Sequence, residues 1–175
     1  MTIESLLEVA VEQFSEHGFD GASTRAIAAK SGTAMSSITY HFGGKQGMYL
    51  AAADHIADRI LARMTPGLAA ARELIAASPD NGREAVCRVV DHFAQMMFAP
   101  DAAPWTTFIL REQQHPTEAF DRIFQTAMRP LAEFLLEAVG RLRPDLAAEE
   151  LRATVVLLMG QAMVLRVARA SIARL

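Results

Sequence analysis

Residues 23–45 read S-T-R-A-I-A-A-K-S-G-T-A-M-S-S-I-T-Y-H-F-G-G-K. The stretch predicts two short helices, over residues 23–30 and 34–41, with a turn at Ser31-Gly32-Thr33 between them. Two helices joined by a turn of about three or four residues that contains glycine form a helix-turn-helix. Because the second helix is too short to be stable alone, packing must hold it in place, and Ile38 and Phe42 can face Ile27 and Phe14 for that packing.

The polar side of the second helix is expected to face outward, where the major groove of DNA would meet it. Its members are Ser36, Ser37, Thr39, Tyr40 and His41. The local charge agrees, since residues 21–53 hold no acid and three cations, Arg25, Lys30 and Lys45. Charge alone also fits an ordinary solvated surface that lacks acids by chance.

The rest of the chain is expected to be helical, because strong helix formers dominate and no alternating strand pattern occurs. The expected helices cover residues 3–17, 23–30, 34–41, 45–64, 68–77, 83–98, 105–115, 116–142 and 146–174. Pro66-Gly67 is expected to kink or end one helix, and Pro130 to kink or interrupt another. The predicted fold class is all-α, with an N-terminal three-helix helix-turn-helix domain at residues 1–47 and a larger helical domain at residues 48–175.

Composition excludes several classes of protein. The 175 residues are 51% hydrophobic and 21% charged, with a net charge of −3, which excludes intrinsic disorder. The longest apolar run, residues 155–167, is interrupted by Gln161 and Arg166, so no membrane span is expected. Residues 1–4 lack the features of a secretory signal, and the lone Cys87 excludes an internal disulfide and a cysteine-based zinc site. We therefore expect a cytoplasmic protein.

The sequence shows no pattern of an enzyme or a metal site. The five histidines are scattered along the chain, at His17, His41, His55, His92 and His115. There is no glycine-rich phosphate loop, no G-x-S-x-G and no H-E-x-x-H. We expect no catalytic residue, no metal and no cofactor.

Several motifs resemble the DNA-binding domain of the TetR/AcrR family of one-component transcriptional regulators. They are T-R-A-I-A at residues 24–28, S-G at 31–32 and I-T-Y-H-F-G-G-K at 38–45, and the match covers about residues 3–50 without gaps. The continuation Q-x-x-Y-L, with R-E-Q at 111–113 and H-P-T at 115–117, resembles the CecR (CerR-type) branch over most of the chain. The resemblance implies DNA binding by the first domain, and ligand binding and dimerisation by the second.

The resemblance also assigns roles to residues of the first domain. Ser23 caps the second helix, and Thr24 and Arg25 touch backbone phosphate. The recognition helix and its surroundings contribute Met35, Ser36, Ser37, Thr39, Tyr40, His41 and the phosphate-binding Lys45. The chain departs from the family at Ala34, which cannot cap the recognition helix, and Thr33 is the nearest residue able to do so. Because that helix has no Arg, Asn or Gln, base readout would depend on hydroxyls, methyl contacts and DNA shape.

Apolar residues are dense between residues 86 and 128, where they fit either a solid core or a ligand pocket between helices. The resemblance implies a small-molecule effector in this domain. The residues expected to line its pocket are Phe93, Met97, Trp105, Phe108, Arg111, Glu112, Phe124 and Met128. For Arg111 and Glu112, structural pairing beside the core is the alternative.

The last predicted helix is apolar over more of its circumference than one core-facing stripe, which indicates burial against a partner subunit. The expected contacts of a homodimer are Leu151, Val155, Met159 and Met163. Members of the branch continue for another helix, so either a truncated chain or a reduced dimer interface is expected.

Together these observations favour a ligand-responsive regulator, a repressor that binds a palindromic operator in double-stranded DNA as a homodimer and is released by a small-molecule effector. One alternative, motivated by Ala34 and by the sparse base-reading side chains of the recognition helix, is a helical small-molecule-binding protein with degenerate DNA binding. A second is a small enzyme that uses Arg111, Glu112 or His115 in the apolar pocket. DNA binding with a salt-dependent affinity separates the first hypothesis from both alternatives.

Overall fold

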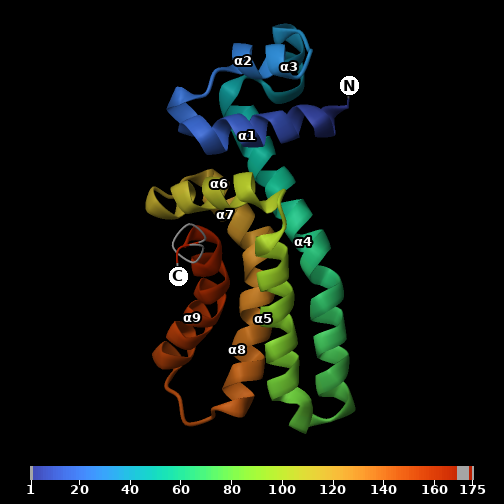
Figure 1. Cartoon of the computed structure of the whole chain (residues 1–175), viewed down its shortest axis with the longest axis vertical. Coiled ribbons are helices and arrows are strands. Elements are labelled where there is room, and N and C mark those ends of the chain that lie inside the picture. The colour runs from blue at the N-terminus through green and yellow to red at the C-terminus, as the bar shows by residue number, and fades with distance from the viewer. Residues whose placement is uncertain (1, 169–173, 175) are drawn as a thin grey trace. The chain divides into compact units, whose positions relative to one another are not determined.

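A computed structural model of the chain describes residues 2–168 and 174, and every regular element among them is helical (Figure 1). The elements are α1 Ile3–Gly21, α2 Thr24–Lys30, α3 Met35–Phe42, α4 Lys45–Ala77, the 3-10 turn Pro79–Asn81, α5 Gly82–Phe98, α6 Ala102–Gln114, α7 Glu118–Ile123, the π-helical turn Phe124–Met128, α8 Arg129–Leu142 and α9 Ala148–Val167. The predicted all-α class is confirmed. None of the described helices is long and apolar enough to cross a membrane.

The chain packs as two compact units. Unit 1 consists of Met1–Arg59 and Ala103–Thr126, and unit 2 of Ile60–Ala102 and Ala127–Leu175. Unit 1 therefore joins the helix-turn-helix to most of α6 and to α7, while α4 contributes residues to both units. The predicted functional division at residues 1–47 and 48–175 stays a prediction.

The local geometry of the helix-turn-helix follows from its capping residues. The Ser23 hydroxyl accepts a hydrogen bond of 3.4 Å from the backbone N–H of Ala26, so Ser23 caps α2 as predicted. Ala34 stands at the N-cap of α3 in an extended conformation, and no side chain caps this helix. Gly43 ends α3 with φ +70°, a left-handed conformation that costs glycine little because it has no Cβ.

Helix α4 continues through Pro66, so the predicted end of the helix there, with a separate helix over residues 68–77, is wrong, while the alternative of a kink at Pro66-Gly67 stays a prediction. Proline removes a backbone N–H and leaves the carbonyl four residues earlier, that of Ala62, without its helical partner, whereas His92 contacts the neighbouring carbonyl. In unit 2, Nε2 of His92 lies 2.7 Å from the carbonyl oxygen of Arg63 and donates to it. A Cβ on Gly67 would approach the His92 ring to 2.8 Å, so glycine leaves room for this contact. A hydrogen bond from His92 of α5 therefore contacts α4 close to the point where it continues through Pro66.

The predicted helix over residues 116–142 is divided. It begins at Glu118, because the Thr117 hydroxyl accepts the Ala119 N–H at 3.2 Å and caps α7. The π-helical turn Phe124–Met128 then separates α7 from α8, and Pro130 lies in the first turn of α8. The interruption predicted near Pro130 is confirmed. The predicted C-terminal helix is observed as Ala148–Val167, and the part of that prediction over residues 169–173 lies outside the described residues.

Each unit has its own apolar core. In unit 1 the Tyr49 ring meets Phe14 edge-on, with ring centroids 4.9 Å apart, and stacks on Phe108 at 4.8 Å. The fully buried side chains of this unit include Phe14, Ile27, Ile38, Met48 and Phe108. In unit 2 they include Met64, Val89 and Leu135. Helix α5 packs against both α8 and α9 in this second core.

Candidate nucleic-acid interface and effector site

Helix α3 is held by a single fully buried side chain. Ile38 has no exposed surface, and Ile27 of α2 and Phe14 of α1 are buried in the same core. Because residues on opposite sides of a helix point in opposite directions, this anchor turns the polar side of α3 outward. The predicted orientation of the helix is confirmed.

The outward side of α3 carries the residues predicted to read DNA. Tyr40 is 85% exposed, and Met35 is also exposed. Ser36, Thr39 and His41 are exposed too, whereas Ser37 is half-buried. The Tyr40 and His41 rings meet edge-on with centroids 5.0 Å apart. The helix thus offers hydroxyl groups, a methyl group and two adjacent rings to the solvent.

The three cations of the helix-turn-helix differ in whether they already bind another residue of the chain. Lys30 donates to a Glu12 carboxylate oxygen at 2.8 Å, and this contact raises the pKa of Lys30. Lys45 donates to the Asp20 carbonyl at 3.0 Å, and its Nζ lies 4.9 Å from the centroid of the Phe19 ring. Arg25 is exposed and pairs with none of the described residues, and Thr24 beside it is half-buried.

Glu112 is the centre of a buried polar network in unit 1. Only 3% of Glu112 is exposed, and its Oε1 accepts a hydrogen bond of 2.6 Å from the Tyr49 hydroxyl. Its Oε2 accepts bonds from the Thr117 hydroxyl at 2.7 Å and from the backbone N–H groups of Thr117 and Phe120 at 3.1 Å. The carboxylate therefore accepts hydrogen bonds from free backbone N–H groups at the start of α7, where a helix favours negative charge. Through Tyr49 it also bonds to α4. Burial first, and then this hydrogen bond, raise the pKa of Tyr49.

Arg111 contacts the end of the first helix. Its Nε donates to the Ser15 carbonyl at 3.0 Å, and a terminal nitrogen donates to the Glu16 carbonyl at 3.1 Å. Gly18 follows with φ +71°, so carbonyls just before this break in α1 receive the guanidinium. The contacts of Arg111 and Glu112 favour the structural alternative for both residues over an effector contact.

The other predicted effector residues are divided between the two units. In unit 1, Trp105 and Phe108 are buried, Trp105 beneath the Arg59 guanidinium at 5.6 Å, while Phe124 is exposed and stacks on Phe120. In unit 2, Phe93 and Met97 are buried and Met128 is half-buried. Phe93 and Met97 thus serve as core residues of unit 2, and an effector cavity lined by the predicted set stays a prediction. Among the described residues, no group of three or more His, Cys, Asp or Glu could hold a metal ion.

Two family descriptions match the chain. Residues 6–52 match the bacterial regulatory proteins of the tetR family, and residues 83–175 match the C-terminal domain of the HTH-type transcriptional dual regulator CecR. The chain belongs to the TetR family of transcriptional regulators. This is a family of regulators and not of enzymes, so the alternative of an enzyme using Arg111, Glu112 or His115 is set aside.

Individual relatives agree with this membership. The chain is 34% identical over 140 residues to the transcriptional dual regulator CecR of Shigella flexneri, across 78% of this chain and 62% of that protein. It is 30% identical over 140 residues to the regulatory protein RaaS of Mycobacterium tuberculosis, across 79% of this chain and 58% of that protein. The chain thus spans less than two thirds of the length of either relative. The crystal structure of a TetR-like regulator from Rhodococcus sp. RHA1 has the same fold, with a TM-score of 0.67 and 20% identity over 97% of this chain and 84% of that one.

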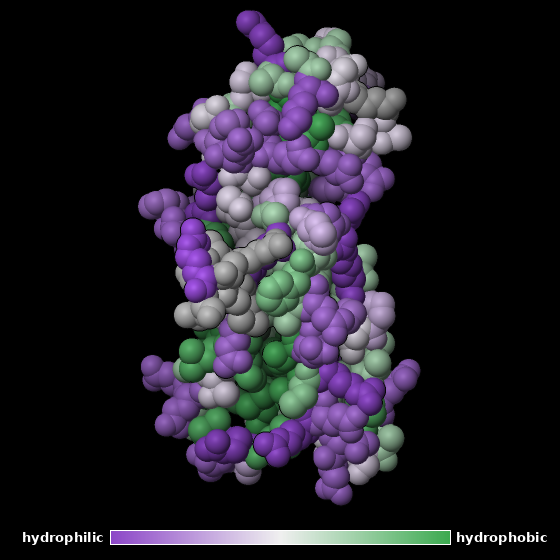
Figure 2. Space-filling model, in the orientation of Figure 1, coloured by the Kyte–Doolittle hydropathy of each residue, from purple (hydrophilic) through white to green (hydrophobic). Residues whose placement is uncertain are grey.

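Helix α9 of this TetR-family chain has an apolar stripe that is exposed in the single subunit. The stripe comprises Val156, Leu157, Val164 and Val167, and the first two are each 67% exposed. Of the predicted dimer residues, Val155 is only 3% exposed, while Leu151, Met159 and Met163 are half-buried. Figure 2 shows hydrophobic surface over α9 and the neighbouring helices of unit 2. Val155 has little surface to offer a partner, so the exposed stripe is the better candidate for that role.

Tyr49 and Ser15 are residues of unit 1 that the sequence analysis missed. Tyr49 binds Glu112, and the carbonyl of Ser15 receives Arg111, although both pairs are far apart along the chain. The one signal in the sequence was the pair of charges at 111–112 directly after the apolar Phe108-Ile109-Leu110. Charges so close to a core need partners, but nothing local identifies them.

Proposed function

We propose that this TetR-family chain is a transcriptional repressor that binds a palindromic operator as a homodimer and is released by a small-molecule effector. The observation that carries the proposal is the division of α3 into a buried anchor, Ile38, and an exposed polar side that includes Tyr40. In helix-turn-helix proteins the second helix enters the major groove and its outward side chains meet the base edges. Residues proposed for this interface are Thr24, Arg25, Met35, Ser36, Ser37, Thr39, Tyr40, His41 and Lys45.

Phosphate contacts would set the register of the protein on DNA. Arg25 is exposed and uses none of its donors on other described residues. Lys45 uses one of its three donors on the Asp20 carbonyl, which fixes its position and leaves the others for phosphate. Contacts of this kind position the protein, whereas the α3 side chains would select the sequence.

Dimerisation would place two copies of α3 on successive half-sites. The support is the uncovered stripe of α9, whose burial against a second copy removes apolar surface from water. Two copies related by a two-fold axis present matching surfaces to each other and require a palindromic operator.

Selection of genomic DNA fragments by the purified chain tests the proposal. The expected result is enrichment of a palindrome, with an affinity that falls steeply as salt rises, because bound cations displace counterions from phosphate. Tyr40→Ala is the matched control, since it should remove enrichment of the palindrome while leaving the chain folded. Fragments enriched equally by both proteins would contradict sequence-specific binding by α3.

The second candidate function is a helical binding protein that has lost specific DNA binding. The observation in its favour is Ala34, which leaves the start of α3 without a side-chain cap. In that case the selection would recover no shared sequence. If the missing cap is the cause, Ala34→Ser should restore enrichment of a palindrome.

A further inference from the structure

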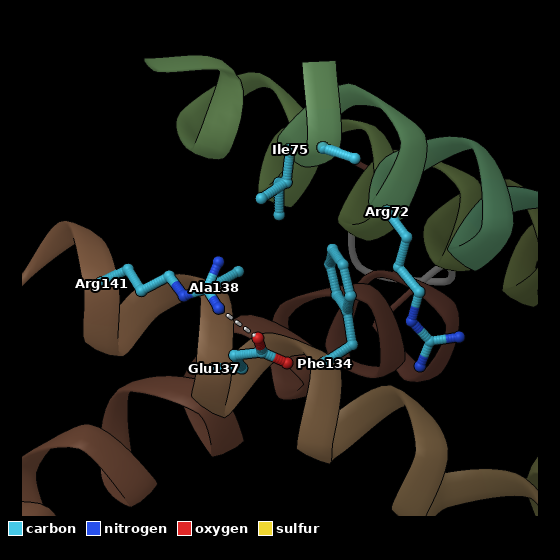
Figure 3. Close-up of a pocket in the computed structure, with 7 residues that line it drawn as sticks. Arg72, Ile75, Phe134, Glu137, Ala138 and Arg141 are labelled. Atoms are coloured by element: carbon cyan, nitrogen blue, oxygen red, sulfur yellow. Dashed lines mark hydrogen bonds and ion pairs between the residues drawn. The ribbon is translucent and has the colours of Figure 1, made fainter. Parts of the chain in front are cut away.

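Unit 2 contains an open groove of about 290 Å³ between the second half of α4 and α8 (Figure 3). Helix α4 contributes Arg72, Ile75 and Ala76, and α8 contributes Phe134, Glu137 and Arg141. None of the residues that the sequence predicted for the effector lines this groove. In Figure 3 the side chains of Ile75 and Phe134 point toward each other across the opening.

The two arginines of the groove are not equivalent. Arg141 donates to the Glu137 carboxylate at 2.7 Å, so its charge is matched by a neighbour one helical turn away. Arg72 is exposed and has no hydrogen bond or ion pair with any described residue. Its guanidinium lies on the other side of Phe134 from that ion pair (Figure 3). The groove therefore has an apolar middle, a neutralised end and an end with a free positive charge.

We propose that this groove binds a small organic monocarboxylate with an aryl or branched alkyl tail. The carboxylate pairs with Arg72, whose planar guanidinium matches its two oxygens, and the tail lies against Ile75 and Ala76, because Phe134 is only 4% exposed and offers it little surface. The volume is at the lower end of the roughly 300–1,000 Å³ of ligand pockets, so the ligand has on the order of a dozen non-hydrogen atoms. As an effector site, the groove rests on the proposed function.

Titration calorimetry of the full chain with 4-phenylbutanoate tests the site. The uncharged 4-phenylbutanamide is the control ligand. The amide preserves the shape of the acid and removes its charge, so the acid should bind and the amide should bind several-fold more weakly. Arg72→Gln should lower the affinity for 4-phenylbutanoate by about three- to tenfold. The loss is modest because the ion pair between ligand and arginine is exposed to water. Arg83→Gln on α5, another exposed arginine of unit 2, should leave the affinity unchanged.

A second variant blocks the site from within. Ala76 lies four residues after Arg72 on an exposed turn of α4, and glutamate is a good helix former. Ala76→Glu should pair with Arg72, occupy the groove and abolish binding of the acid. Equal binding of acid and amide, or undiminished binding by Arg72→Gln or Ala76→Glu, would overturn the proposal.

Addition of 4-phenylbutanoate to the complex with a selected operator separates this site from the proposed function. Weaker DNA binding in the wild type, with the response of Arg72→Gln shifted to about three- to tenfold higher ligand concentration, supports the site and its role as an effector site. Carboxylate binding that leaves DNA affinity unchanged supports the site and contradicts release by this ligand.

Discussion

The hydroxyl of Tyr49, in α4, donates a hydrogen bond of 2.6 Å to the buried carboxylate of Glu112, in α6. The contact joins residues 63 positions apart in the chain and places a polar pair inside the aromatic core of unit 1. Tyr49→Phe should lower the free energy of unfolding by about 1–3 kcal/mol, because a buried carboxylate oxygen loses its donor. Urea unfolding at neutral pH measures this loss.

The same pair predicts a dependence on alkaline pH. Because burial and the bond to Glu112 raise the pKa of Tyr49, the folded chain holds the phenolic proton more tightly than the unfolded chain does. The resulting stabilisation is complete below the unfolded pKa of about 10 and is lost as pH rises beyond it. The wild type should therefore lose more unfolding free energy between pH 9 and 11 than Tyr49→Phe does. Tyr40→Phe, at the other tyrosine, is the control and should behave like the wild type. If the unfolding free energies of the wild type and Tyr49→Phe fall in parallel with pH, Tyr49 is not the cause of the alkaline loss.

Ala34 predicts a stabilising substitution. Its backbone already has the extended conformation of an N-cap, with φ −78° and ψ 145°, but its side chain cannot accept a hydrogen bond. Ala34→Ser should raise the free energy of unfolding by about 0.5–2 kcal/mol. Thermal melting measures the gain, and Ser23→Ala should cause a loss in the same range, toward its lower end because the Ser23 bond is long at 3.4 Å. No change in melting for Ala34→Ser would mean that α3 is already held fully by Ile38.

Tyr40 and Ile38 lie two residues apart and should respond in opposite ways to truncation. Tyr40→Ala removes an exposed side chain, so the unfolding free energy should stay within about 0.5 kcal/mol while affinity for a selected operator falls. Ile38→Ala opens a cavity under α3 and should cost about 2–5 kcal/mol. Chemical denaturation and DNA titration of both variants check the assignment. A destabilised Tyr40→Ala with normal DNA binding would contradict it.

Lys45 should contribute to DNA binding without selecting the sequence. Lys45→Ala should weaken binding to all sequences alike and reduce the slope of log affinity against log salt by about 1. Lys30→Ala is the comparison, and it should change the slope less, since Glu12 already matches the charge of Lys30. Fluorescence anisotropy over a salt series measures both slopes, and an unchanged slope for Lys45→Ala would remove this residue from the interface.

Local signals in the sequence predicted the helix-turn-helix well. The cap at Ser23, which the resemblance implied, depends on a backbone N–H only three residues away, and the apolar Ile38 in a polar helix marked the side that is buried with α1 and α2. The continuation of α4 through Pro66 was not predictable in this way. It is accompanied by a hydrogen bond from His92, 29 residues from its acceptor, and by the space that Gly67 leaves for the ring.

Residues whose roles depend on distant partners were the hardest to assign. The sequence marked Arg111 and Glu112 as charges that need partners, but Ser15 and Tyr49 become their partners only in the folded unit. The groove residue Arg72 gave no signal at all, because an exposed arginine on a helix is ordinary until a second helix places Phe134 beside it.

Helix α9 offers a direct test of dimerisation through two nearby residues. Leu157 is 67% exposed and Val155 is 3% exposed in the single subunit. Leu157→Glu places a charge where only a partner would bury it, so the chain should stay folded but sediment at half the mass of the wild type. Val155→Glu places the charge in the core of unit 2 and should reduce the melting temperature of the subunit itself. Leu157→Glu should also lose tight operator binding, because one recognition helix reaches only one half-site. Analytical ultracentrifugation of all three proteins decides the matter, and a wild type that sediments as a folded monomer at micromolar concentration would overturn the homodimer.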